Sequence, residues 1–356
     1  MKKRDISIDI IRGIAIVIML GANVVGYVTS CTLHPMWFNI LSSFAAPLFI
    51  LLSGYMVAIN SVKKHDSLSY YLVRGGTMIL TAALVDVLIW HLVPFATFDV
   101  LYIIGLGMPV VYLLEKKSLG VKAGFIAVVL AITVALRFTW KYMDFPMETD
   151  FTSSNADYSI LTPFNLIKAL LYDGWFPIFP WIAIPVLGSI FAHFRKKADN
   201  NFANAKVVII GTLLTIAGFA WLYFGYTKEH AFDALIQRDP YGELFYPTTI
   251  PFLLGAFGVA LLIFAIVDKT RYGIVWQPLT IFGQTSLFNY ILHSAIVAYI
   301  VTPVFGFKDK GLYPLNMGWT VYGLLVIVSL LLSWAVVVMK RKVKIKNFLF
   351  NFYFGG

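Results

Sequence analysis

The sequence has few charged residues and almost no cysteine, and both shortages exclude classes of protein. Charged residues make up 13% of the 356 residues, whereas a soluble globular chain carries about 25%. The single cysteine, Cys31, excludes a disulfide within the chain. The HExxH, CxxC, GxSxG and P-loop patterns are missing, which argues against zinc proteases, nucleophile-elbow hydrolases and nucleoside triphosphatases.

Apolar residues take up 59% of the chain, and the mean hydropathy is +0.79. They fall in blocks of about 20 residues, the length of helix that crosses a hydrocarbon layer of ~30 Å. We predict an all-α polytopic membrane helix bundle, one membrane-embedded domain over residues 1–356. Its ten spans lie near 6–28, 38–60, 70–91, 99–114, 119–139, 176–194, 206–226, 248–267, 279–302 and 317–339.

The distribution of charge predicts the orientation of these spans. Lys and Arg gather in segments 2–4, 63–64, 116–117, 195–206, 269–271 and 340–346, which the positive-inside rule places in the cytoplasm. Most acids fall in expected external segments: 144–173 and 229–243, within two expected external loops at 140–175 and 227–247, and Asp309. Both termini are therefore expected in the cytoplasm of a multi-pass cell-membrane protein. The net charge of +10 reflects this topology, and no soluble basic module for nucleic acid exists.

Polar residues within the first span have a structural and a functional interpretation. Asp9 and Arg12 are three residues apart and can form an ion pair that anchors the start of the helix. Arg12 and Asn23 share one helix face, separated by about 16 Å, which places Asn23 in the outer half of the membrane. An asparagine in a span is often a hydrogen-bonding link between helices, while ionisable groups there often mark a site.

Further polar residues are expected at the same outer level. His34 precedes the second span, and Asp86 reaches a similar depth in the third. A polar face of the ninth span, counted from residue 279, places His293 about 20 Å deep; its members are Ser286, Asn289, Tyr290 and His293. A lone histidine or asparagine is commonly structural, but several converging ionisable groups favour a functional site.

Several motifs together resemble those of one family. Residues 7–13 (SIDIIRG) are similar to the S-x-D-x-x-R-G start of the heparan-alpha-glucosaminide N-acetyltransferase family and its bacterial and archaeal relatives. In that family a histidine follows an asparagine by eleven residues and precedes x-x-Trp, the spacing of Asn23, His34 and Trp37. Residues 44–54 and 283–293 also resemble family segments, although the family's Asp-Leu, two or three residues before the proline, is missing from Phe44-Ala45-Ala46 here. A wider set of membrane acyltransferases with an early Arg-Gly and a late histidine is a close rival.

The resemblance implies acyl transfer across the membrane, from cytoplasmic acetyl-CoA as co-substrate to an amine or hydroxyl of an external sugar or glycan. His34 is then the expected general base, Asn23 a donor to the thioester carbonyl, and His293 a rival base or an orienting group. Arg12, supported by Asp9, and Arg74 lie toward the inside, where CoA phosphates need cations. We expect no metal, and predict substrate contacts from Trp37, Asp86, Ser286, Asn289 and Tyr290.

Two other functions stay open at this stage. A transporter or flippase for a glycan or lipid-linked substrate would use the same groups to bind substrate, and inverted repeats would favour it, but the sequence has none. A structural membrane subunit would leave the converging histidines unexplained. The bilayer is the partner that the composition itself implies, and a homodimer is compatible with the sequence.

Overall fold

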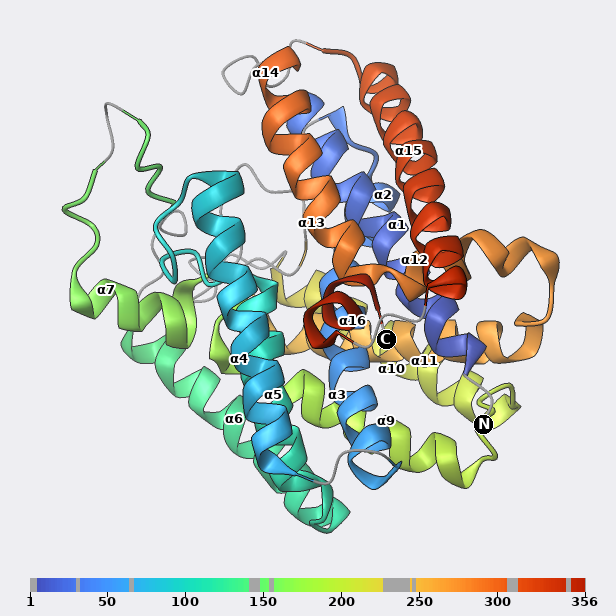
Figure 1. The fold of residues 1–356 in the computed structure, drawn as a ribbon. Coiled ribbons are helices and arrows are strands. Elements are labelled where there is room, and N and C mark those ends of the chain that lie inside the picture. The colour runs from blue at the N-terminus through green and yellow to red at the C-terminus, as the bar shows by residue number, and fades with distance from the viewer. Residues whose placement is uncertain are drawn as a thin grey trace.

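The computed structural model describes residues 5–29, 33–63, 67–140, 148–153, 157–226, 244, 248–305, 313–343 and 347–355. Over these residues the protein is helical, and its one β-bridge joins Leu92 to Asp150. Figure 1 shows long helices packed side by side, with shorter ones between and across them. The chain is therefore an all-α polytopic membrane protein, as the composition predicts.

The helices follow the predicted blocks. The longer ones are α1 (Ile6–Val28), α3 (Ala45–Lys63), α4 (Leu68–Val85), α5 (Val100–Glu115), α6 (Leu119–Thr139), α9 (Ala183–Lys197), α10 (Ala205–Tyr226), α11 (Ile250–Thr270), α13 (Ser286–Ile296) and α15 (Leu315–Lys342). The shorter ones are α2 (Met36–Ser42), α7 (Pro163–Lys168), α8 (Ile178–Trp181), α12 (Gln277–Gln284), α14 (Thr302–Phe305) and α16 (Phe348–Phe354). Within the described residues nine helical segments are long and apolar enough to cross a membrane, and the shorter α5 occupies the fourth predicted span, 99–114.

Two predicted spans differ from the helices that form. The sixth is a broken helix over 163–197, where α7 is followed by the π-helical turn η3 (Ala169–Asp173), then α8 and α9. Figure 1 shows α7 crosswise to α4, so part of the expected external loop 140–175 is helical. The other expected loop, 227–247, lies outside the described residues except for Leu244.

The ninth predicted span is divided at Thr285, whose backbone (φ −124°, ψ 32°) is not helical. Helix α12 packs separately against α1, so the span proper begins at Ser286. The helix of His293 therefore does not run unbroken from residue 279, as the count of about 20 Å assumed. His293 lies about 10 Å along α13 from Ser286.

Close helix contacts are made through glycine. A side chain at Gly13 of α1 would collide with the backbone of Leu279 in α12, and one at Gly283 would collide with the backbone of Asp9. Small residues let helix backbones approach in a membrane, where hydrophobic burial gives no attraction between helices. This double contact fixes α12 against the first half of α1 and sets the position of α13 beyond it.

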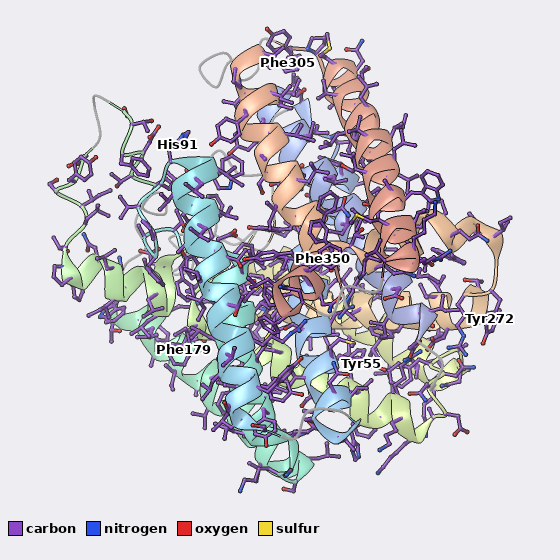
Figure 2. The ribbon with its side chains drawn as sticks, in the orientation of Figure 1. Tyr55, His91, Phe179, Tyr272, Phe305 and Phe350 are labelled. Carbon is purple, nitrogen blue, oxygen red and sulfur yellow. The ribbon has the colours of Figure 1, made fainter. Side chains whose placement is uncertain are left out.

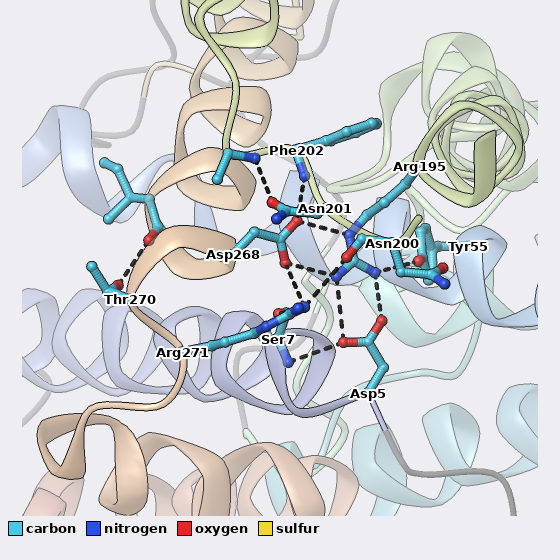
Figure 3. Close-up of polar contacts among 12 residues, drawn as sticks. Asp5, Ser7, Tyr55, Arg195, Asn200, Asn201, Phe202, Asp268, Thr270 and Arg271 are labelled. Carbon is cyan, nitrogen blue, oxygen red and sulfur yellow. Dashed lines mark hydrogen bonds and ion pairs between the residues drawn. The ribbon is translucent and has the colours of Figure 1, made fainter. Parts of the chain in front are cut away.

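A buried ion network joins four parts of the chain at what we name the basic end, where α9 and α11 finish and α1 begins (Figure 3). Arg195, fully buried, donates to Asp268 of α11 through Nε (3.0 Å) and Nη2 (2.7 Å). It also donates to Asp5, which caps α1, and to the hydroxyl of Tyr55 in α3 at 2.7 Å. In the sequence Arg195 stands out only as part of the basic segment 195–206, a topology signal. Its role in joining helices depends on partners that are distant in the sequence.

Candidate functional site

Two of the predicted catalytic residues are in direct contact. Nδ2 of Asn23 on α1 lies 2.8 Å from Nε2 of His293 on α13. The other ring nitrogen of His293, Nδ1, lies 3.0 Å from the carbonyl oxygen of Asn289, one turn earlier. Because a carbonyl oxygen can only accept, Nδ1 carries the proton, and Nε2 accepts from the amide of Asn23. Both nitrogens of His293 are therefore engaged.

A second polar group lies beside this pair. The ring of Tyr290 meets the ring of His293 edge to face, with centroids 5.5 Å apart. Its hydroxyl donates to Oδ2 of Asp99, the residue that caps α5. The hydroxyl of Tyr102, one turn further along α5, donates to Oδ2 of Asp86 at 2.6 Å. Side chains from α1, α4, α5 and α13 thus meet at one level, as the polar pattern predicts.

Irregular helix turns shape this level of the bundle. Helix α4 ends in a π-helical turn, η2 (Asp86–Trp90), and α13 continues into another, η6 (Val297–Val301). The hydroxyl of Tyr299 in η6 donates to the carbonyl of Leu88 in η2, which joins the two turns. His91 then ends η2 in a left-handed conformation (φ 56°), at the end of α4 seen in Figure 2. π-turns occur frequently at functional sites.

His34 lies six residues beyond the end of α1, and the groups around its ring differ from those around His293. Its ring meets that of Phe38 edge to face at 5.5 Å. Burial lowers the pKa of His34 below its usual value, and the nearby side chain of Asn39 and carbonyls of Val25 and Thr29 partly oppose that shift. Nε2 of His34 is buried and has no hydrogen-bond partner in the part of the chain that the structure describes. Asn23 thus pairs with the histidine of α13, and the nearer histidine in sequence keeps one ring nitrogen unoccupied.

Three of the residues predicted to contact the substrate lie in different surroundings. Asn289 is fully buried, and its amide donates to Oγ of Ser333 on α15 (2.8 Å) and to Thr285. Ser286, half-buried, is the first residue of α13. Trp37 is 60% exposed and stacks on Trp319 of α15, with ring centroids 5.8 Å apart. Asn289 therefore joins helices, and Trp37 belongs to an aromatic cluster between α2 and α15.

The predicted CoA-binding residues lie nearer the basic end. Asp9 is buried in the first turn of α1, and Arg12 follows it half-buried. The guanidinium of Arg74 on α4 lies over the ring of Phe352, 5.3 Å from its centroid. Phe352 belongs to α16, which also contacts α4 through Tyr353. Figure 2, where Phe350 is labelled, shows this short helix between α4 and α15.

Two residues of this site were missed from the sequence. Asp99 stands directly before an apolar run, the position of a helix N-cap, and that signal could have found it. Tyr102 has no sequence signal of its own, because its partner Asp86 lies on another helix. In the part of the chain that the structure describes, no three His, Cys, Asp or Glu side chains are grouped in a way that could hold a metal ion.

Comparison with known protein families identifies the family of this chain. Residues 4–228 match the family described as heparan-alpha-glucosaminide N-acetyltransferase, catalytic, over more than half of the chain. The chain belongs to that N-acetyltransferase family. Residues 192–342 also match a family described as protein of unknown function (DUF418), and no curated protein matches the chain.

The two matched segments of this transmembrane acetyltransferase meet at the site. Asn23 lies in the N-acetyltransferase segment, and His293 lies in the part matched only by the second family. The hydrogen bond between them therefore joins the two segments.

Proposed function

We propose that this protein transfers an acetyl group from cytoplasmic acetyl-CoA to an amine or hydroxyl of an external sugar or glycan, with His34 as general base. One observation supports His34 over His293 as the base. Among the described residues Nε2 of His34 has no hydrogen-bond partner, whereas both ring nitrogens of His293 are engaged, one of them by Asn23. A general base needs a ring nitrogen that can accept a proton from the acceptor.

The proposed step is direct transfer. The acceptor's nitrogen or oxygen attacks the thioester carbonyl while neutral His34 removes its proton, and the carbon–sulfur bond then breaks. The proton passes from His34 to the leaving CoA thiolate, so the base returns to its neutral form. Asn23 has a second amide hydrogen beyond the one donated to His293, and this hydrogen stabilises the negative charge that develops on the carbonyl oxygen.

The donor would lie along α1. Arg12 is about 16 Å from Asn23 along the helix, toward the basic end. CoA carries its phosphates and its thioester at opposite ends, so it needs cations and a carbonyl-binding group that are separated in this way. We assign Arg12, and Arg74 of α4, to the phosphates. Asp86 and Tyr290 lie beside the reacting level and would contact the acceptor.

The proposal is tested with purified full-length protein, radiolabelled acetyl-CoA and a panel of amino sugars and neutral glycans. Label recovered on an acceptor supports it, and the same reaction with His34→Gln measures the contribution of the base. Uptake of a labelled sugar into proteoliposomes with no acetylated product would instead indicate a transporter. Acetylation that is equally fast in the His34→Gln variant would remove His34 from the mechanism.

A further inference from the structure

An apolar crevice of about 220 Å³ lies away from this site, between α3, α6, α9 and α11. Every residue that lines it is apolar, with Ile126 and Leu130 from α6 facing Leu253 and Ala260 of α11. The crevice is partly open to the surroundings. An apolar cavity of this kind excludes water, so its occupant is a hydrocarbon.

The position of the crevice along α11 indicates which kind of hydrocarbon would occupy it. It follows α11 from Ile250 to Ala260, about 15 Å, which is half of a ~30 Å hydrocarbon layer. Ile250 begins α11 at the end opposite to the basic end, so this is the half that the charge pattern places toward the outside. The flanking α6 exposes large apolar side chains such as Val128 and Ile132, as a helix in contact with lipid does. The surrounding medium is therefore the external leaflet.

A cation lies beyond the outer end of the crevice. Arg137 is two turns beyond Leu130 on the same face of α6, and its guanidinium donates to the carbonyl of Thr248, just before α11 begins. Its Nε is buried and has no hydrogen-bond partner among the described residues. An arginine at the external end also departs from the positive-inside rule, so topology does not account for it. The planar guanidinium fork matches a phosphate group.

We propose that this crevice binds one acyl chain of an external-leaflet phospholipid and that Arg137 binds its phosphate. The crevice supplies the apolar half of the site and the guanidinium supplies the polar half. The lining residues come from helices other than α1 and α13, so the site is separate from the Asn23–His293 pair. The competing interpretation is that Arg137 only joins α6 to Thr248 and that the crevice holds any hydrocarbon.

Two photoactivatable probes with the same diazirine-bearing acyl chain separate these interpretations: phosphatidylglycerol, and diacylglycerol, which lacks the phosphate. The full chain is reconstituted in phosphatidylcholine nanodiscs with a trace of either probe, irradiated, and digested for mass spectrometry. We expect labels on peptides that contain residues 126–130 and 250–260, about tenfold more from phosphatidylglycerol, since a charged hydrogen bond supplies that preference. Arg137→Gln should remove the preference, and Arg137→Lys should keep part of it.

Filling the crevice provides the second arm of the test. Ala260→Trp should abolish labelling at both peptides, and Ala183→Leu on α9 is a smaller filling change should the first variant fail to fold. Equal labelling by the two probes in the unmodified protein would overturn the phosphate site and leave an adventitious lipid only. Strong labelling that persists when the crevice is filled would overturn the acyl-chain site.

Discussion

Asn23 and His293 are 270 positions apart in the sequence and are joined by a 2.8 Å hydrogen bond in the structure. The bond orients the amide of Asn23, and the carbonyl of Asn289 holds the imidazole that accepts it. In the proposed mechanism His293 acts through Asn23, which makes it a positioning residue. The two side chains should therefore behave as a unit in kinetics.

The first prediction is a double-mutant cycle on this pair. Asn23→Ala removes a donor to the developing oxyanion and should lower kcat by about 10²–10³. His293→Ala should lower kcat by less, and the double variant should be no slower than Asn23→Ala alone, because the histidine has nothing left to orient. The measurement is kcat and KM for acetyl transfer in the four proteins. Multiplicative losses would show that the two residues act independently.

The second prediction concerns His34 itself. His34→Gln should reduce kcat by about 10²–10⁴, the usual contribution of a general base, while CoA binding is retained. His91→Gln is the matched control, since His91 ends η2 and has no assigned role in the chemistry. Near-normal turnover in His34→Gln together with a large loss in His293→Ala would make His293 the general base in place of His34.

The third prediction is a pH profile. Burial holds the pKa of His34 below its usual value of ~6.5. The base works in its neutral form, so it is fully available at neutral pH, and kcat/KM should fall only as the pH drops through that lowered pKa. Replacing Asn39 by Leu removes a group that raises the pKa, so the acidic limb should move to still lower pH. If the acidic limb of the pH profile is unchanged in His34→Gln, a group other than His34 produces it.

Apolar block length and the placement of Lys and Arg were sufficient to predict the helical membrane fold and nearly every span. The polar face of α13 and the level of Asn23 were predicted as well, because helical spacing is a local property. The break at Thr285 was missed, since α12 is held apart from α13 by two close contacts with α1, of Gly13 with Leu279 and of Gly283 with Asp9. The pairing of Asn23 with His293, rather than with the nearer His34, is likewise set by tertiary packing.

The fourth prediction separates two roles of Arg74, contact with CoA and attachment of α16. Arg74→Gln should weaken CoA binding if the guanidinium reaches a phosphate, whereas Phe352→Leu removes only the ring beneath it. We therefore expect a lower CoA affinity in Arg74→Gln and an unchanged or higher affinity in Phe352→Leu, measured by isothermal titration. Equal affinities in all three proteins would leave Arg74 as an anchor for α16.

The last prediction concerns stability at the basic end. Arg195 is fully buried and pairs with the carboxylates of Asp268 and Asp5, so Arg195→Met removes this contact from both acids and leaves the buried Asp268 with the longer contact to Arg271 (3.4 Å). Removing one member of a buried ion pair costs about 3–5 kcal/mol, because the remaining charge stays desolvated. The expected result is a large fall in the denaturation midpoint of purified protein, measured by intrinsic fluorescence. Lys196→Met, at the exposed neighbouring position, is the control and should change the midpoint little. Arg195→Lys keeps the charge but loses the two-pronged contact with Asp268, so it should fall between the two. If Arg195→Met were as stable as Lys196→Met, the network would not hold α1, α9 and α11 together.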